Sequence, residues 1–567
     1  MKSRAFVVLG IAGAFRIAAW LRHTALPLLF LAGAAAEPAM AITYYVATNG
    51  SNSNSGKSID APFLTVQKAA NVVLPGDTVM IRGGIYRESV ESIRGGTAAA
   101  PVTFQNYPGE VATIMGSKVV TGWVSDGGSV WKKTGWVVNS QQVFVDFATK
   151  PGKSLQQIGM PSGWYGPWEY PAPVGSNRAS MIPGSFYYSP AEQTLYVWLA
   201  DGSDPNAHVM EASTQMRLFT MHQPYMRLKG IKFRHSNYSA SAQQGAAVEL
   251  SSYSVADGID VQYVDFAGIS MGYLQNGAVA QNVIANNNGS VGIMAAGSTN
   301  FRVTNAVLQF NNRRNFNQNW HAGGFKGASN TYGIVENCEV GVNNGPGIWF
   351  DHARSGQAII VRNNFVHDNT PGEGAIFMEA SKNGLVYNNV LVNNLRRGIY
   401  LSASDNNQVY NNTIVGTKER AGIEVNGMPR AGMTLTNNTL SNNSISSGTT
   451  VYDLYIYPSD GYTVANNTSD YNNFYRSSGV LALRYASNYT SLQAWQDATG
   501  FDRHSRSATP SFVGPSGTPP GYAVKAGSVL IDGGKNLGAM VPNDFKRVAR
   551  PAGGAFDIGA YEFVATP

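Results

Sequence analysis

Residues 345–390 read GPGIWFDHARSGQAIIVRNNFVHDNTPGEGAIFMEASKNGLVYNNV, and this stretch contains one pattern twice. Each half has a small residue, an alternation of apolar residues, an acid, a turn and a pair of asparagines near valines. Short apolar alternations broken by Gly, Asn or Ser are typical of strands joined by tight turns. The acids that end the two alternations are Asp351 and Glu379.

A looser form of the pattern, V-x-N-x-x-V, recurs through the middle of the chain. Successive asparagines are 23, 32, 26, 25, 23, 26 and 29 residues apart. A leucine-rich repeat shares this period, but its leucine signature is missing and β-branched residues take its place. The repeat therefore predicts an all-β fold, a right-handed parallel β-helix, in which stacked asparagine side chains bond from coil to coil at a tight turn. The asparagines are Asn282, Asn305, Asn337, Asn363, Asn388, Asn411, Asn437 and Asn466.

The chain outside the repeat predicts a targeting segment, two end regions and an insertion. The N-terminus carries basic residues, a short apolar run, ALPLLFLAGAAA, and the small residues AMA before Ile42. This run is too short to span a bilayer, so we expect a cleaved signal peptide, a secreted or periplasmic protein, and no membrane anchor after cleavage. The expected segments are the signal peptide 1–41, an N-terminal cap with the first coils at 42–116, an inserted β-rich subdomain at 117–213, coils carrying the site at 214–480, and a C-terminal cap region at 481–567.

Composition excludes several classes of function. The net charge is +6, and removal of the signal peptide leaves +3, which is too weak to indicate a nucleic-acid partner. The single cysteine, Cys338, allows no internal disulfide and lies in a valine-flanked strand pattern, which predicts a buried, inert thiol. CxxC, HExxH and phosphate-loop motifs are missing, so the sequence gives no support for redox, zinc-protease or nucleotide chemistry.

Aligning the strands that precede the asparagine phrases gives two outward-facing columns. The aligned units are GISMG (268–272), GIMAA (292–296), AGGFK (322–326), GIWFD (347–351), AIFME (375–379), GIYLS (398–402) and GIEVN (422–426). Because side chains alternate along a strand, the apolar second and fourth residues should face the core and the third and fifth should face outward. In this alignment the third column contains Trp349, Phe377, Tyr400 and Glu424, and the fifth contains Lys326, Asp351, Glu379 and Ser402.

The fifth column places two carboxyl groups on adjacent coils. Equivalent residues of neighbouring coils lie ~4.8 Å apart, close to the about 5–5.5 Å that separates the two acids of retaining glycosidases. Lys326 on the far side of Asp351 should keep Asp351 ionised, which predicts Asp351 as the nucleophile and Glu379 as the acid/base. The neighbouring rings are expected to offer a flat surface to a sugar. Other expected substrate contacts are Trp349, Phe377, Tyr400, Ser402, Glu424, and the loop residues Trp320 and His321.

Two other interpretations of the acids stay open on the residues alone. Alternating charges along a solenoid face also form structural ion pairs, which stabilise little. Adjacent carboxylates are also suitable ligands for calcium, so calcium is a possible ligand although the hydrolytic chemistry requires no cofactor.

The GIWFD and AIFME units, with a β-rich insertion near the start of the helix, resemble the β-helical xylosidases of glycoside hydrolase family 120. The stretch after the signal peptide and the C-terminal PAGGAFDIGAYEF also resemble the ends of secreted β-helix enzymes that act on polysaccharides. The family resemblance implies an Asp nucleophile and a Glu acid/base from neighbouring coils, which are Asp351 and Glu379 here. The expected substrate is a poly- or oligosaccharide.

Two rival functions share the expected fold. Lys326 in GGFKGASN resembles the lysine of the chondroitinase B and alginate lyase group, which implies a polysaccharide lyase with Lys326 as base. That group places an Arg on the following coil, where this chain has Asp351, although Arg354 is near enough in sequence to reach in from the turn. The other rival is a non-catalytic glycan-binding β-helix, because this fold alone does not determine function.

Overall fold

The computed structural model describes residues 40–159, 173–238, 245–427, 430, 432–447, 451–457, 464–515 and 517–565. The expected signal peptide falls almost entirely outside these residues. Within the described ranges, no helix combines the length and the apolar character that crossing a membrane requires.

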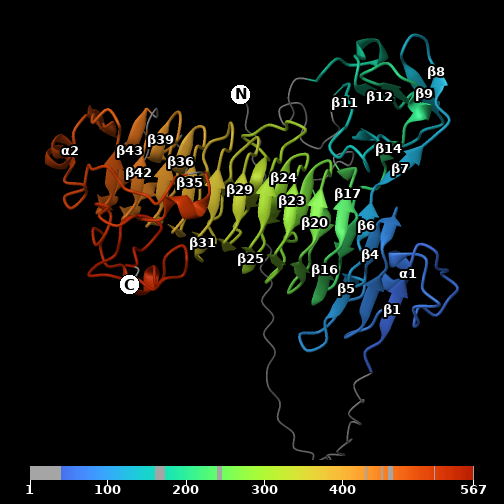
Figure 1. Ribbon diagram of the computed structural model, residues 1–567, viewed down its shortest axis with the longest axis horizontal. Helices are drawn as coiled ribbons and strands as arrows, with labels where there is room; N and C mark the ends of the chain where they lie inside the picture. The colour runs from blue at the N-terminus through green and yellow to red at the C-terminus, as the bar shows by residue number, and fades with distance from the viewer. Residues whose placement is uncertain are drawn as a thin grey trace, which may run out of the picture. The chain divides into compact units, whose positions relative to one another are not determined.

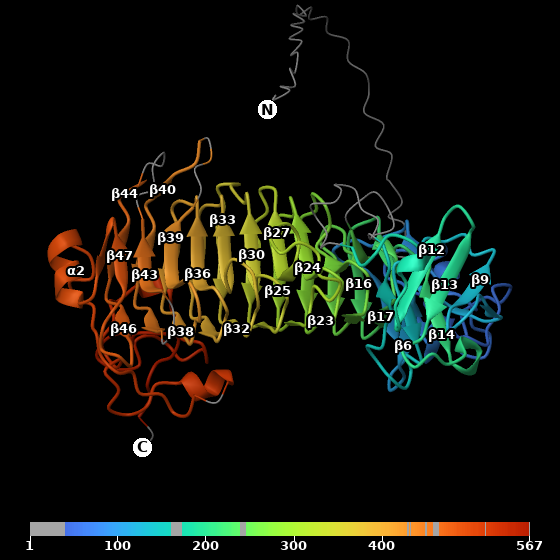
Figure 2. The ribbon, with the colours of Figure 1, turned by 90° about the horizontal axis from the view of Figure 1, so that it is seen from above.

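Most strands belong to three long parallel sheets, in which each strand pairs with the equivalent strand of the next coil (Figures 1 and 2). Together the sheets form the right-handed parallel β-helix, so the predicted fold class is confirmed. Sheet A has 13 strands. They are β1 (Thr43–Val46), β2 (Thr78–Ile81), β5 (Val102–Asn106), β16 (Met226–Lys229), β19 (Val255–Asp257), β22 (Val279–Gln281), β25 (Phe301–Thr304), β28 (Gly333–Glu336), β31 (Ile359–Arg362), β34 (Gly384–Tyr387), β37 (Gln408–Tyr410), β41 (Thr439–Ser441) and β45 (Thr468–Asp470).

Sheets B and C complete each coil. Sheet B has 12 strands, namely β3 (Gly84–Tyr86), β6 (Ala112–Met115), β17 (Lys232–Arg234), β20 (Asp260–Gln262), β23 (Ile284–Asn286), β26 (Val307–Gln309), β29 (Glu339–Gly341), β32 (Phe365–His367), β35 (Val390–Val392), β38 (Thr413–Val415), β42 (Ser444–Ser446) and β46 (Asn473–Tyr475). Sheet C has 13, namely β4 (Val90–Ser92), β15 (Phe219–Met221), β18 (Ala246–Glu249), β21 (Ala267–Ser270), β24 (Val291–Ala296), β27 (Gly323–Ala328), β30 (Ile348–Asp351), β33 (Ile376–Glu379), β36 (Arg397–Ser402), β39 (Ala421–Asn426), β43 (Tyr452–Ile456), β47 (Leu483–Tyr485) and β48 (Ser487–Tyr489).

The strands between β6 and β15 form two small sheets apart from the three long ones (Figure 1). One has the order β10-β14-β7 and the other β11-β12-β13-β9-β8. We refer to residues 117–213 as the insert. Its strands are β7 (Ser117–Val120), β8 (Val124–Ser125), β9 (Trp131–Thr134), β10 (Val143–Val145), β11 (Gln156–Gln157), β12 (Ser185–Ser189), β13 (Thr194–Trp198) and β14 (Met210–Ser213).

Two short helices lie near the two ends of the solenoid. Helix α1 (Val66–Ala70) buries Val66, Ala69 and Ala70, and helix α2 (Leu492–Thr499) buries Trp495. Both buried faces join the same hydrophobic core, which runs through the coils. Because a solenoid leaves apolar ends, these helices serve as caps. A further pair of short strands, β40 (Leu435–Thr436) and β44 (Val464–Ala465), pairs outside the long sheets.

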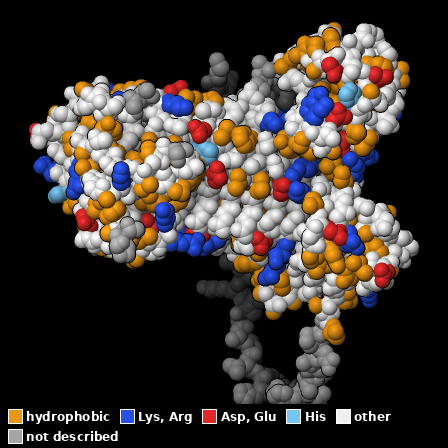
Figure 3. All heavy atoms as spheres, viewed as in Figure 1, with side chains coloured by type: hydrophobic (Ala, Val, Ile, Leu, Met, Phe, Trp, Pro, Cys, Tyr) orange, Lys and Arg blue, Asp and Glu red, His pale blue; other side chains and the backbone are white. Residues whose placement is uncertain are grey.

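The second and fourth residues of the aligned units face the core, as the period of two requires. Ile348, Phe350, Ile376 and Met378 are fully buried members of one continuous cluster. Cys338 belongs to the same cluster and is a free thiol, as predicted. On the face shown in Figure 3, basic and acidic side chains are interspersed.

The recurring asparagines shape the turns, but most of the buried ladder comes from their neighbours. All eight predicted asparagines have φ between +50° and +57°, a left-handed conformation that asparagine adopts more readily than most residues. In the turn between sheets A and B, the next residue along the chain points inward and bonds from coil to coil at 3.0–3.1 Å. This ladder consists of Asn364, Asn389, Asn412, Asn443 and Asn472.

Two of the eight asparagines belong to a different turn from the one predicted. Asn437 and Asn466 precede strands of sheet A rather than sheet B. The pattern V-x-N-x-x-V occurs at both turns because each needs a left-handed residue between strands.

Asn389→Ala is expected to lower the free energy of unfolding by about 2 kcal/mol, measured by denaturant titration. The Asn389 amide donates to the Val361 carbonyl at 2.9 Å and accepts from the backbone and side chain of Asn364, each at 3.0 Å. The substitution leaves these groups buried without a partner. Asn319→Ala, at an exposed position, is the control and should change stability by less than about 0.5 kcal/mol. Equal effects of the two substitutions would contradict the ladder's role.

The C-terminal segment packs along the turn between sheets A and B. Asn388 donates to the Asn543 carbonyl at 2.6 Å, and Asn411 donates to the Asp557 carbonyl at 2.8 Å. On the next coil, Asn442 donates to the Lys535 carbonyl at 2.8 Å. One stretch of chain therefore contacts three successive coils.

Candidate active site

The two predicted acids lie side by side at the ends of neighbouring strands in sheet C. Asp351 of β30 pairs in register with Glu379 of β33, and Glu379 pairs with Ser402 of β36. Both carboxyl groups are partly exposed, 23% for Asp351 and 15% for Glu379. Since neighbouring strands are ~4.8 Å apart, the two carboxyl groups leave sheet C one strand spacing apart.

Lys326 occupies a different column from the one predicted. Lys326 pairs with Trp349, and Ala328 pairs with Asp351, so the alignment of the AGGFK unit was wrong by two residues. Phe325 fills the position of Ile348, and Gly327 fills that of Phe350. The glycines on both sides of Phe325 give no apolar signal, so the pattern did not fix which inward position Phe325 occupies.

The Lys326 ammonium nevertheless reaches Asp351. Its Nζ lies 3.3 Å from Asp351 Oδ2 and 3.5 Å from the centre of the Trp349 ring, and it donates to the Trp320 carbonyl. The side chain is only 7% exposed. Burial lowers the pKa of Lys326, while the Asp351 carboxylate acts in the opposite direction.

Two residues that the sequence analysis missed complete the surroundings of the acids. His352 Nδ1 lies 2.7 Å from Asp351 Oδ1, and Arg430 donates to Glu379 Oε1. The nitrogens Arg430 Nη1 and His352 Nε2 are 3.5 Å apart. His352 directly follows Asp351 in the sequence, and this position next to a predicted site residue could have indicated it. Arg430 comes from the loop after β39, outside the aligned columns, and no pattern indicated it.

The pKa of Glu379 is raised above its usual range. Burial is the main cause, and the neighbouring Asp351 carboxylate adds to it. Arg430, Lys326 and His352 act in the opposite direction without cancelling the rise. The site thus holds two adjacent acids, and Glu379 keeps its proton more readily than an ordinary glutamate.

The predicted aromatic surface is buried. Trp349, Phe377 and Tyr400 are 1%, 3% and 8% exposed, so the expectation that they offer ring faces to a sugar is wrong. Their rings stack on one another, with centroids 5.3 Å and 5.0 Å apart. Aromatic residues in one column of a parallel sheet are spaced for face-to-face stacking, so the rings cover one another. Lys326 covers the Trp349 end of the stack and Arg397 covers the Tyr400 end.

Glu424 is also buried, contrary to its expected role as a substrate contact. It accepts from Arg397 Nε at 2.6 Å and from Arg420 Nη2 at 3.0 Å, and it has no exposed surface. The sheet alternation predicted its outward direction but not the arginines that cover it. Ser402 is 6% exposed, directly beside Glu379.

The loop before β27 contains two residues predicted to contact the substrate, His321 and Trp320. His321 stacks on Phe266 with centroids 4.9 Å apart and lies 3.1 Å from Ser290 Oγ, so it is buried rather than available to a sugar. Burial, together with the Lys326 charge, lowers the pKa of His321 to about 3, so its imidazole is neutral. Trp320 is partly buried and meets Lys326 through its carbonyl.

Two further expectations do not fit the geometry. Arg354 pairs with Asp405 at 2.7 Å and not with the acid pair, which removes the arginine expected for the lyase alternative. Among the residues described by the structure, no group of three or more His, Cys, Asp or Glu side chains is placed to hold a metal ion. Asp351 and Glu379 instead contact the cationic side chains Lys326 and Arg430, so the donor set does not fit calcium.

Comparisons with known proteins agree with the fold. A family profile described as "Right handed beta helix region" matches residues 291–469. The uncharacterized protein YwoF of Bacillus subtilis is 41% identical over 75 residues, which are 13% of this chain and 16% of YwoF. Pectate lyase PEL9 of Emericella nidulans is 36% identical over 82 residues, 14% of this chain and 20% of that protein. This chain thus covers a fifth or less of the length of either relative.

Among solved structures, the complex of XylC with xylose superimposes with a TM-score of 0.58 at 16% sequence identity. The superposition covers 78% of this chain and 86% of that one. At this identity the similarity shows a shared fold.

Proposed function

We propose that this protein is a secreted or periplasmic carbohydrate-active enzyme, a retaining glycoside hydrolase with Asp351 as nucleophile and Glu379 as acid/base. Its substrate is a poly- or oligosaccharide. The observation that carries the proposal is the pair of acids in register on adjacent coils, with Lys326 in contact with Asp351.

The spacing of the coils supports a retaining mechanism. Retaining glycosidases use two carboxyl groups about 5–5.5 Å apart, one attacking the anomeric carbon and one protonating the leaving oxygen, whereas inverting enzymes need about 6.5–9.5 Å. Equivalent positions one strand apart are separated by ~4.8 Å, which leaves no room for the water of an inverting mechanism.

The charges around the acids support the assignment of roles. The ammonium of Lys326 and the imidazole of His352 contact the two carboxyl oxygens of Asp351, and such contacts hold the carboxyl group in place for attack on the anomeric carbon. Burial and the Asp351 charge raise the pKa of Glu379, which favours the protonated form that a general acid requires. Once the glycosyl group is attached to Asp351, that charge is lost and Glu379 gives up its proton more easily, as the second, basic step demands.

The comparisons support the general class of substrate, a carbohydrate. One similar structure is named as a complex with xylose, and one curated relative is named as a pectate lyase. Hydrolysis and elimination of a sugar chain are therefore the two candidate reactions, and the experiment described below distinguishes them.

One observation favours polysaccharide lyase activity as a second candidate. Burial lowers the pKa of Lys326, and a lyase base must be a neutral amine. The ammonium, however, is enclosed by the Trp349 ring, the Trp320 carbonyl and Asp351, which leaves little access to a sugar C–H. Hydrolysis is the better supported reaction for this reason.

The deciding experiment incubates purified protein with neutral and uronate-containing glycans and measures two products. New reducing ends without absorbance at the wavelength of unsaturated uronates, retained at least in part in Lys326→Ala, would support hydrolysis. Absorbance that rises with the reducing ends and disappears in Lys326→Ala would establish elimination instead. Binding without any product would favour a non-catalytic glycan-binding β-helix.

Arg430→Gln should move the alkaline limb of the kcat/KM pH profile to higher pH. The Arg430 charge favours the ionised form of Glu379 and so holds its pKa down, against burial and Asp351. Without this cation the pKa of Glu379 rises further, and the protonated acid persists to higher pH. Arg354→Gln, which removes an equal charge beside Asp405, is the control and should leave the limb in place. A shift to lower pH would contradict the role of Glu379 as the acid.

A further inference from the structure

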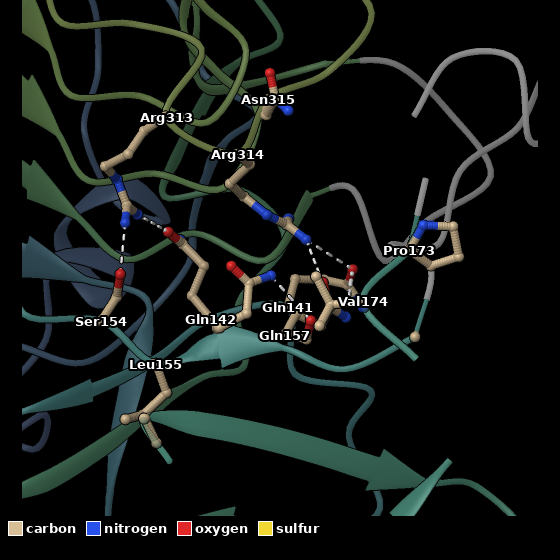
Figure 4. Close-up of a pocket in the computed structure, with 13 residues that line it drawn as sticks. Gln141, Gln142, Ser154, Leu155, Gln157, Pro173, Val174, Arg313, Arg314 and Asn315 are labelled. Carbon is tan, nitrogen blue, oxygen red and sulfur yellow. Dashed lines mark hydrogen bonds between the residues drawn. The ribbon is translucent and has the colours of Figure 1, made fainter. Parts of the chain in front are cut away.

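Hydrogen bonds hold the insert on the solenoid. Arg313, from the loop between β26 and β27, donates to Ser154 Oγ at 2.6 Å and to Gln142 Oε1 at 2.5 Å (Figure 4). In the same loop, Arg314 donates to Gln157 Oε1 (Figure 4). The insert is therefore attached to the coils through its side chains as well as through the backbone, and a ligand bound to it stays beside the solenoid.

The five-stranded sheet of the insert has one face in a core and one face outside it. Phe186, Leu195 and Val197 are buried in a cluster that also contains residues of β7, β10 and β14, so the two sheets of the insert pack face to face. Because side chains alternate along a strand, Tyr187 of β12 and Trp198 of β13 point to the opposite face. Both aromatic side chains are partly exposed there.

An open pocket lies on this outer face, apart from the acid pair. Its volume is about 760 Å³, within the range of ligand-binding pockets. Tyr187 and Trp198 line it together with the polar side chains of Asn177, Arg178 and Glu192. The pocket therefore offers aromatic surfaces and hydrogen-bonding groups side by side.

The charged groups of the pocket are held by neighbours within the insert. The Tyr196 hydroxyl donates to Glu192 Oε2 at 2.8 Å, and hydrogen bonds from Tyr196 and Ser189 lower the pKa of Glu192, so its carboxyl group is ionised at neutral pH. Arg178 pairs with Asp126 and lies over the Tyr196 ring, with Cζ 5.4 Å from the ring centre, yet its side chain is 48% exposed. Among the described lining residues, Glu192 and Arg178 are the charged ones, and their charges are opposite.

An uncharged saccharide fits this combination of groups. A carboxylate accepts hydrogen bonds from sugar hydroxyl groups, and a guanidinium group donates in a fork to adjacent oxygen atoms. Aromatic rings provide flat surfaces on which the C–H face of a sugar ring can pack. Because the lining contains one charge of each sign, it does not favour a ligand with a net charge.

We propose that this pocket binds an uncharged saccharide, so that the insert holds a neutral glycan at a second site. Glu192 and Arg178 bind the hydroxyl groups, and Trp198 and Tyr187 contact the C–H groups of the ring. The role of this saccharide as part of the enzyme's substrate rests on the proposed function, whereas binding of a free saccharide does not.

The test measures the binding of neutral trisaccharides to the Glu379→Gln protein, in which turnover is suppressed, by calorimetry. The ligands are cellotriose, xylotriose and mannotriose, with trigalacturonate as an acidic comparison. Adding Trp198→Ala should weaken one binding event of at least one neutral ligand about tenfold or more. If the acid pair also binds that ligand, a second event remains unchanged, and if it does not, the weakened event is the only one. Failure of the proposed function is thereby distinguished from failure of the pocket.

Glu192→Gln is the second variant because the side chain is exposed and the amide keeps its shape, so the thermal midpoint should be kept. It should weaken the same binding event about threefold, since an amide oxygen accepts a weaker hydrogen bond than a carboxylate. Tyr273→Ala, which removes an exposed ring from the solenoid, is the control and should leave every binding event unchanged.

Three results would overturn the proposal. The first is that no neutral trisaccharide binds. The second is unchanged affinity in both Trp198→Ala and Glu192→Gln, which would show that the rings only pack against Met181 and Tyr196. The third is tighter binding of trigalacturonate than of every neutral ligand at the event that Trp198→Ala weakens.

Discussion

Glu379→Gln should reduce kcat by roughly 10²–10⁴-fold on a natural glycan, because an amide cannot protonate the leaving oxygen. Glu379 pairs in register with Asp351 and holds its proton more readily than an exposed glutamate, so its loss removes the acid without disturbing the strand. The measurement is steady-state release of reducing ends by wild type and variant. Glu339→Gln, at a more exposed glutamate on β29, is the matched control and should be as active as wild type.

Two further measurements, one with an aryl glycoside substrate and one with added azide, test the roles of the two acids separately. An aryl glycoside with an acidic leaving group needs little protonation, so its first step should survive in Glu379→Gln, and azide should then give a product of retained configuration. With Asp351→Ala, azide should attack directly and give the opposite configuration. Activity of Glu379→Gln within a few-fold of wild type would rule out the assignment of the acid.

The other large effect concerns stability. Trp349→Ala should lower the free energy of unfolding by about 3–5 kcal/mol, the range found for large aromatic residues removed from cores. Trp349 is 1% exposed between the Lys326 ammonium and the Phe377 ring, so the substitution opens a cavity and leaves a buried cation over it. The measurement is denaturant-induced unfolding.

Two comparisons separate the aromatic stack from a general effect of removing a ring. The indole N–H of Trp349 has no hydrogen-bond partner among the described residues, so Trp349→Phe should cost clearly less than Trp349→Ala. Tyr273→Ala, at a side chain that is 69% exposed, should cost less than about 0.5 kcal/mol. A Trp349→Ala cost as small as that of Tyr273→Ala would mean that the stack is not a stabilising unit.

The fold could be predicted from the sequence because each coil repeats the same local requirements. Alternating apolar residues had to face one core, and a left-handed asparagine follows each of the seven consecutive sheet A strands from β22 to β41. The register of Asp351 with Glu379 followed from the same alternation. Their catalytic roles remain a prediction.

The failures concern contacts between residues distant in sequence and, for Lys326, a strand without a clear apolar pattern. Alternation indicates which way a side chain points but not what covers it, so the burial of Trp349 and Glu424 was missed. Lys326 was placed in the wrong column because the glycines around Phe325 carry no apolar signal. Arg430 reaches Glu379 from 51 residues away along the chain, and nothing local marks it.

The contacts of the C-terminal segment determine where unfolding of the solenoid is expected to begin. In a repeat structure each coil is held by its neighbours, so terminal coils are the usual starting point for opening. Here the side chains of Asn388, Asn411 and Asn442 donate hydrogen bonds to the C-terminal segment. This one segment therefore links three coils into a single cooperative unit. Amide hydrogens of β35, β38 and β42 should therefore exchange together, and unravelling should begin from the other end of the molecule.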